Sequence, residues 1–185
     1  MSEPARRRRL CFTALVLLAD VCDLAWEHFH GGVVSHHILH RADLPAISNW
    51  WGVLLLPALT WFLISRVQRR LGPPSVGEEK ASTAKIYVAI RFFGSSLLGI
   101  LLAISFTFHL ESVSSYGFYG ILVLAILLPV YRAECVLGFV LSMAFTFGAV
   151  LPIAAGSVIA ALSAIIHRLL LPRLVRLWKF LKPAP

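Results

Sequence analysis

Five of the chain's 7 histidines lie in one short segment, which reads EHFHGGVVSHHILHRAD between Glu27 and Asp43. They are His28, His30, His36, His37 and His40. Imidazole nitrogens, with carboxylates beside them, bind zinc, iron, copper or manganese. The segment therefore predicts a divalent transition-metal site with these five histidines as ligands. The residue types do not distinguish between the four metals.

Three acidic residues precede the histidines at helical spacing. Asp20, Asp23 and Glu27 occupy positions i, i+3 and i+7, which places them on one face of a helix. His30 joins that face if the helix continues for one more turn. Acidic groups within an apolar helix are costly and usually face a bundle interior or a wet cavity. We expect Asp20 to bind the metal, and Asp23 and Glu27 to be catalytic groups, as further ligands or as a general base.

The histidine segment also contains features that would bring its two halves together. Gly31 and Gly32 permit a sharp reversal of the chain. A helix starting at Ser35 would make His36 and His40 neighbours on one face, because they are four residues apart. Asn49 stands where the next apolar stretch begins, and we expect it either to cap that helix or to contact the polar cluster.

His109 and Glu111 form a second short polar segment, between two other apolar stretches. If this segment lies on the same side as the five histidines, its side chains add two more metal ligands. Three alternatives remain open for the whole set. The first is a pH-sensitive surface, because imidazole titrates near neutrality. The second is a haem site between His28 or His30 and His109. The third is that the histidines are polar residues at a membrane edge with no chemistry.

The elements that must position these residues are apolar helices. Of the 185 residues, 58% are hydrophobic and 14% are charged, and the hydrophobic residues occur in blocks near the roughly 20 residues that a helix needs to cross a bilayer. We predict an all-α, polytopic integral membrane bundle that forms a single domain over residues 1–185. Its six transmembrane helices are expected at about residues 10–27, 50–67, 86–108, 118–131, 135–149 and 152–167, and a basic amphipathic tail at 168–185.

One apolar run, from Cys135 to Ile166, is too long for a single span and too short for two full ones. Gly148 and Pro152 lie near its middle, which favours two short helices joined by a tight turn. A single kinked helix and a re-entrant pair are the alternatives.

In the third expected span, at residues 86–108, Arg91 lies near the first end. We expect its side chain to extend to the membrane interface. The alternative is an ion pair with Glu134.

The net charge of +8 comes mainly from basic clusters at the ends of apolar runs. Lysine and arginine at these positions set topology, and they place both termini in the cytoplasm and the histidine segment outside. A nucleic-acid groove would need aromatic or polar residues among the basic ones on a soluble surface, so no nucleic acid is expected. The expected partners are membrane lipids and either further copies of the chain or another membrane protein. The expected location is a bacterial-type inner membrane.

These features favour a metal-dependent membrane enzyme acting on a lipid or another membrane-resident substrate at the outer face. Zinc-activated water would give hydrolysis, and iron or copper would give redox chemistry. One alternative is a metal-ion or proton-coupled transporter or metal-handling protein, in which the histidines collect a cation and the acids pass it inward. The other is a non-catalytic accessory membrane subunit. The sequence does not decide whether the chain is an enzyme.

Overall fold

The computed structural model describes residues 3–33, 35–37, 46–72 and 78–181. Its elements in chain order are α1 (Glu3–Phe29), β1 (Ser35–His37), β2 (Ala46–Ser48), η2 (Asn49–Trp51), α2 (Gly52–Leu71), α3 (Glu78–Thr107), α4 (Glu111–Leu127), α5 (Ala133–Phe147), α6 (Val150–Ile165), the π-helical turn η3 (Ile166–Leu170) and α7 (Leu171–Leu181). The described chain is therefore a helical bundle, as predicted. Its departure from all-α structure is the two-stranded ribbon of β1 and β2.

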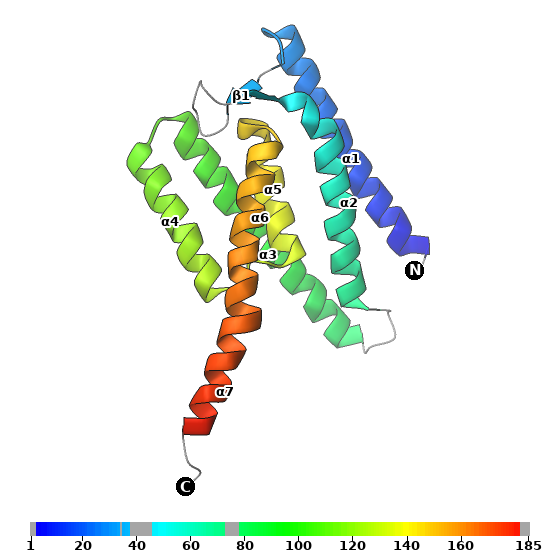
Figure 1. Ribbon diagram of the computed structural model, residues 1–185. Coiled ribbons are helices and arrows are strands. Elements are labelled where there is room, and N and C mark those ends of the chain that lie inside the picture. Colours follow the sequence, from blue (N-terminus) through cyan, green and yellow to red (C-terminus); the bar gives the residue numbers. More distant parts are fainter. Residues whose placement is uncertain (1–2, 34, 38–45, 73–77, 182–185) are drawn as a thin grey trace.

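Successive helices from α1 to α6 run in opposite directions (Figure 1). One end of the bundle holds the end of α1, the ribbon, the α3–α4 link and the α5–α6 link. The other end holds the start of α1, the end of α2, the start of α3 and the α4–α5 link. Helix α7 projects beyond this second end, continuing from α6 through η3. The fold thus places the described part of the histidine segment and the His109 segment at the same end of the bundle.

The long apolar run of the sequence forms two helices, α5 and α6, and not one. Gly148 ends α5 with φ = 68°, a left-handed conformation that glycine adopts without the steric cost of a side chain. Pro152 lies in the first turn of α6, where its missing N–H removes no intrahelical hydrogen bond. Glycine and proline therefore stand where each is tolerated, on the two sides of a tight turn.

The core of the bundle forms around α5. Val140 and Met143 on α5 pack with Leu56 on α2, Leu102 on α3 and Ile159 on α6, all of them buried. Glycines let α3 approach α5 closely: a Cβ atom at Gly138 would touch the carbonyl oxygen of Phe92. Small residues at such positions allow two helix backbones to come together.

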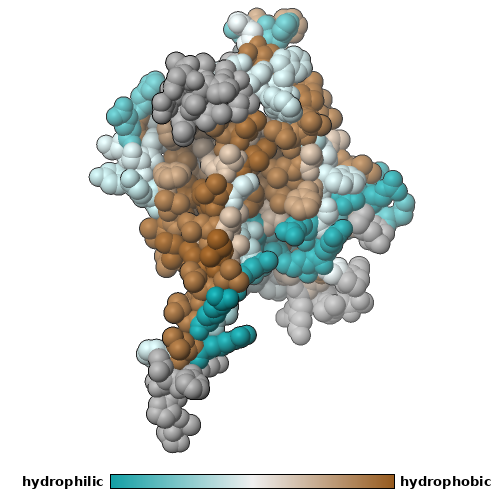
Figure 2. Space-filling model, viewed as in Figure 1, coloured by the Kyte–Doolittle hydropathy of each residue, from teal (hydrophilic) through white to brown (hydrophobic). Residues whose placement is uncertain are grey.

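Outside this core the surface is largely apolar. Exposed side chains on the bundle include Leu54, Phe93, Leu101, Val123 and Val158. In Figure 2 hydrophobic residues cover most of the visible face, and hydrophilic residues gather mainly towards its ends. Three helical segments are long and apolar enough to cross a membrane, at Asn49–Leu71, Ala81–Thr107 and Val150–Trp178, and α4 and α5 are shorter apolar helices.

Two predictions about the polar segments between the apolar runs were wrong. No helix begins at Ser35, because Ser35–His37 is a strand whose residues pair with Ala46–Ser48. The polar stretch after His109 was expected to be a loop as far as residue 117, but α4 already begins at Glu111. Glu111 lies in the first turn of α4, where an acidic residue is favoured by the helix dipole.

Candidate functional site

The face of α1 that carries Asp20, Asp23 and Glu27, here called the acidic stripe, lies against the start of α2. The Nδ2 atom of Asn49 donates a hydrogen bond to Oε1 of Glu27 over 2.7 Å. Asn49 is only 9% exposed, so this contact lies inside the protein and fixes the Glu27 carboxylate. Of the two expectations for Asn49, contact with the polar cluster is correct. The adjacent Ser48 provides the cap, because its Oγ accepts a hydrogen bond from the backbone N–H of Trp50.

Further along this contact between α1 and α2, here called the α1–α2 seam, the Asp20 carboxylate packs directly on Gly52. A Cβ atom at Gly52 would lie 2.6 Å from Oδ1 of Asp20, so any other residue at this position would displace the carboxylate. Oδ2 of Asp20 is buried and has no hydrogen-bond partner. Asp20, Asp23 and Glu27 are each half-buried, whereas Val21 and Trp26 are exposed. The three acids therefore share the face of α1 that meets α2.

The ribbon joins the histidine segment to this seam. Gly31 and Gly32 have φ values of 129° and 100°, and the chain reverses there before β1. Strand β1 pairs antiparallel with β2, with His36 opposite Ile47 and His37 opposite Ala46. Because β2 leads directly into Asn49, the backbone of His36 and His37 is tied to the residue that holds Glu27. The side chains of these two histidines, and all of His40 and Asp43, lie outside the described residues.

His28 lies in the last turn of α1, and His30 follows the end of the helix. Helix α1 ends at Phe29, so His30 does not extend the acidic stripe. Its ring stacks on Trp26 with centroids 3.8 Å apart, and its Nδ1 atom lies 2.8 Å from the carbonyl oxygen of Trp26. His28 makes an edge contact with the ring of Phe29. Both histidines are exposed at the end of the bundle.

His109 and Glu111 line a separate cavity of about 720 Å³ at the same end. Its walls come from the end of α3, the start of α4 and Thr146 of α5, and include no residue of α1. His109 has φ = 53°, a left-handed conformation that is uncommon for a residue with a side chain. Among the residues whose side chains are described, no group of three or more His, Cys, Asp or Glu is arranged to hold a metal.

A second charged cluster lies at the opposite end of the bundle. Oε1 of Glu134 accepts hydrogen bonds from Nη2 of Arg70 over 2.7 Å and from Nη1 of Arg91 over 3.4 Å. The Glu134 side chain is 1% exposed, whereas the two arginines are about one-third exposed. The preferred expectation that Arg91 extends to the interface was therefore wrong, and its alternative, the pair with Glu134, is correct.

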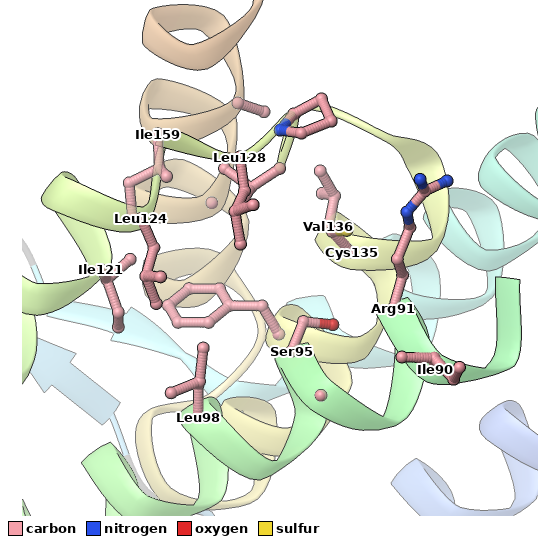
Figure 3. A pocket seen from close by; sticks show the side chains of 16 residues that line it. Ile90, Arg91, Ser95, Leu98, Ile121, Leu124, Leu128, Cys135, Val136 and Ile159 are labelled. Carbon is pink, nitrogen blue, oxygen red and sulfur yellow. The ribbon is translucent and has the colours of Figure 1, made fainter. Parts of the chain in front are cut away.

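Next to this ion pair is an apolar cavity of about 450 Å³. Leu98, Leu124, Phe139 and Ile159 contribute to its walls, so it lies between α3, α4, α5 and α6 (Figure 3). Arg91 stands at its edge. No signal in the sequence indicated this cavity, because the walls come from four helices whose contacts are not visible in a hydropathy pattern.

Chemically, the α1–α2 seam offers carboxylate oxygens to a cation, one of them buried without a partner. The opposite end offers guanidinium groups to an anion. Basic residues at the ends of the apolar runs were expected to set topology and to face membrane lipids, and Glu134 was expected only as an alternative partner of Arg91. Comparison of the chain with protein-family models, with curated proteins and with solved structures finds no match.

Proposed function

We propose that this protein is an integral membrane protein of a bacterial-type inner membrane whose six helices α1 to α6 cross the bilayer, with both termini cytoplasmic. The support is the alternating direction of the helices together with an apolar surface over most of the bundle. Basic residues gather at the end that holds both termini, such as Arg7, Arg69 and Arg173, which agrees with the distribution of positive charge in inner-membrane proteins.

We infer further that the outer end carries a metal site and that the protein is a metal-dependent enzyme acting on a lipid or another membrane-resident substrate. The observation that carries this proposal is the seam between α1 and α2. There, Asn49 orients Glu27, and Asp20 presents a buried oxygen without a partner. Buried carboxylates are rarely left unpaired unless a ligand, ion or water completes them.

In the proposed site the histidines of the ribbon and the acids of α1 are the metal ligands. The two sets are linked through Asn49, which follows β2 in the chain and whose side chain donates a hydrogen bond to the Glu27 side chain. A metal there would supply a Lewis acid or an activated water. Glu27, fixed by Asn49, would then serve as the general base, and Asn49 as a positioning residue. His109 and Glu111 would belong to the surrounding surface, since their cavity has no wall from α1.

The test is the metal content and metal affinity of the purified protein. We expect about one zinc, iron, copper or manganese ion per chain, and loss of it in His36→Ala/His40→Ala and in Asp20→Asn. Asn49→Ala removes only the hydrogen bond to Glu27, and loss of such an outer contact lowers metal affinity about 10- to 100-fold. Gln68→Ala is the matched control, because Gln68 makes an α1–α2 hydrogen bond, to the carbonyl oxygen of Ala5, at the other end of the seam.

Metal affinity should be unchanged in Gln68→Ala. If the wild-type protein purifies without metal and takes up none from solutions of the four ions, the proposed metal site is rejected. If Gln68→Ala loses as much affinity as Asn49→Ala, the effect comes from loosened helix packing, and Glu27 has no special role.

A transporter of protons or metal ions is the second candidate, and one observation favours it. Thr13 on α1 and Thr60 on α2 have buried hydroxyl groups without hydrogen-bond partners. Both lie further inward along their helices than the contact of Asp20 with Gly52. Polar groups therefore continue inward from the acids, as a conduction path requires. Thr60→Val should abolish uptake into proteoliposomes while leaving metal binding intact; unchanged uptake would exclude Thr60 from such a path.

A further inference from the structure

The inner end of the bundle contains a pocket of about 560 Å³ lined by five arginines and a tyrosine, which we call the basic pocket. Its charged and aromatic walls are Arg66, Arg69, Arg70, Tyr131, Arg132 and Arg168. They come from three segments, the end of α2, the α4–α5 link and η3. All three segments lie towards the lower end of the bundle in Figure 1, and they share this pocket. The fold thus concentrates positive charge that the sequence distributes over about 100 residues.

Within the described chain this charge is poorly compensated. Arg70 pairs with Glu134, but that carboxylate also serves Arg91. Arg66, Arg69, Arg132 and Arg168 have no acidic partner among the described residues. The Nε atom of Arg132 is buried without a hydrogen-bond partner. Guanidinium groups this close repel one another unless an anion lies between them, so the pocket is suited to bind one.

The chemistry of the walls favours a phosphate group. Arginine presents a planar set of N–H donors that matches phosphate oxygens in pairs. Arg168 is held over the ring of Tyr131, 4.7 Å from the ring centroid, which limits its freedom before any ligand binds. Helix α5 begins at Ala133, which also lines the pocket, and the positive end of its dipole adds to the attraction.

The basic pocket adjoins the apolar cavity of Figure 3. Pro129 and Val130 line the apolar cavity, and the next residues, Tyr131 and Arg132, line the basic pocket. Arg91 at the edge of the cavity and Arg70 in the pocket bond the same oxygen of Glu134. The basic pocket and the apolar cavity therefore lie on the two sides of the α4–α5 link.

We propose that this pair of compartments binds an anionic phospholipid, with its phosphate among the arginines and part of an acyl chain in the apolar cavity. Anionic lipids are attracted to basic clusters at the cytoplasmic surface of membranes, where the proposed topology puts this end of the bundle. The inference depends on that topology and is independent of the metal site at the outer end. Inorganic phosphate shares the headgroup chemistry and is the competing ligand.

The headgroup is tested by titrating detergent-purified protein with dioleoyl phosphatidylglycerol, dioleoyl phosphatidylcholine or inorganic phosphate, and counting bound molecules by native mass spectrometry. We expect phosphatidylglycerol to bind more tightly than the other two probes. Arg69→Gln/Arg168→Gln should weaken its binding about tenfold, as the loss of charge-assisted hydrogen bonds implies. Arg173→Gln/Arg176→Gln is the matched control, because it removes the same charge from exposed positions on α7 outside the pocket.

The acyl chain is tested by filling the apolar cavity. Gly94 lines it, and a Cβ atom at Gly94 would meet no atom within 4 Å, so Gly94→Leu occupies the cavity without a clash from its first atom. Gly120→Leu is the control, since Gly120 also faces open space but does not line the cavity. Phosphatidylglycerol binding should weaken several-fold in Gly94→Leu, by about the few-fold to tenfold that one excluded apolar contact implies, and stay unchanged in Gly120→Leu.

Two results would overturn the proposal. Equal loss of binding in the α7 control would show that the lipid responds to diffuse surface charge and not to the pocket. Inorganic phosphate that displaces phosphatidylglycerol, with no effect of Gly94→Leu on either probe, would assign the pocket to free phosphate. Binding of phosphatidylglycerol that depends on both Arg69/Arg168 and Gly94 supports the phospholipid.

Discussion

At the scale of single residues, Glu134 is the most deeply buried charged side chain among the described residues. Its side chain is 1% exposed, and one of its oxygens accepts hydrogen bonds from Arg70 and Arg91 while the other has no partner. A buried ion pair adds little to stability compared with an apolar substitute, but breaking one side of it leaves the other charge uncompensated. The carboxylate thus keeps α2, α3 and α5 in one arrangement.

The first prediction concerns this carboxylate. Glu134→Gln keeps the shape of the side chain and removes its charge, so the Arg70 and Arg91 guanidinium groups lose their counter-ion. We expect a loss of unfolding free energy of about 3 kcal/mol, at the low end for a broken buried pair, because both arginines are partly exposed. The measurement is the midpoint of thermal unfolding in detergent, compared with wild type.

Glu111→Gln is the matched control for Glu134→Gln. Glu111 also lies in the first turn of an apolar helix, but it is exposed. Its loss should cost no more than about 1 kcal/mol, the scale of a helix-dipole interaction. Equal destabilisation by the two variants would mean that the ion pair with the arginines contributes nothing beyond a first-turn acid.

At the scale of elements, the contact between α3 and α5 depends on two glycines. A Cβ atom at Gly138 would lie within contact distance of the backbone oxygen of Phe92 and of the hydroxyls of Ser95 and Ser96. A Cβ atom at Gly99 would overlap the Oγ atom of Ser142. Backbone atoms cannot move aside as a long side chain can, so these positions set how closely the two helices pack.

The second prediction is that Gly138→Ala separates α3 from α5. We expect a loss of about 1 to 3 kcal/mol, the usual cost of forcing an extra group into a packed interior. Gly94→Ala on α3 is the control, because its Cβ atom would meet nothing within 4 Å, and alanine in a helix is favoured over glycine by up to about 1 kcal/mol. The midpoint of thermal unfolding of both variants tests this prediction. If Gly138→Ala is as stable as wild type, the packing of α3 against α5 does not depend on a glycine at position 138.

The helices from α1 to α6 could be predicted from the sequence because each contains an apolar block, with charged or glycine-containing breaks between the blocks, and a helix satisfies its own backbone. The strand at Ser35–His37 could not, because it exists only through pairing with Ala46–Ser48. Such pairing overrides the local preference that favoured a helix. The link from Asn49 to Glu27 was one of two expectations, since proximity across 22 residues depends on how the ribbon folds back.

The two cavities mark the limit of the sequence for the functional sites. The basic pocket needs α2, the α4–α5 link and η3 to meet, and the apolar cavity needs four helices around it. The basic clusters were visible in the sequence, but a pocket lined by arginines from distant segments depends on how the fold brings those segments together. Arg91 illustrates the same limit, because its preference for the interface yields to a buried carboxylate nearby.

At the scale of the whole molecule, the direction of the helices decides which residues can act together. The ribbon and the α3–α4 link share one end, and the basic pocket lies at the other (Figure 1). In the proposed topology a metal site at the ribbon faces outward, and the lipid site faces the cytoplasm. The proposed metal site and the proposed lipid site would therefore lie at different leaflets, and neither would require a path through the bundle core, where Val140 is fully buried.

The last prediction tests this topology directly. Ser82 at the start of α3 and Ser115 at the start of α4 are both exposed and lie at opposite ends of the bundle. Single cysteines, Ser82→Cys and Ser115→Cys, are placed in a background with Cys11, Cys22 and Cys135 changed to alanine. In intact cells a membrane-impermeant maleimide should label Ser115→Cys and not Ser82→Cys, and permeabilised cells should show both labelled.

Labelling of Ser82→Cys alone in intact cells would mean that the protein has the opposite orientation. The basic pocket would then lie outside the cell, away from the anionic cytoplasmic surface on which the proposed lipid site depends. Labelling of both in intact cells would mean that α3 does not cross the membrane, because its two ends would then share one side.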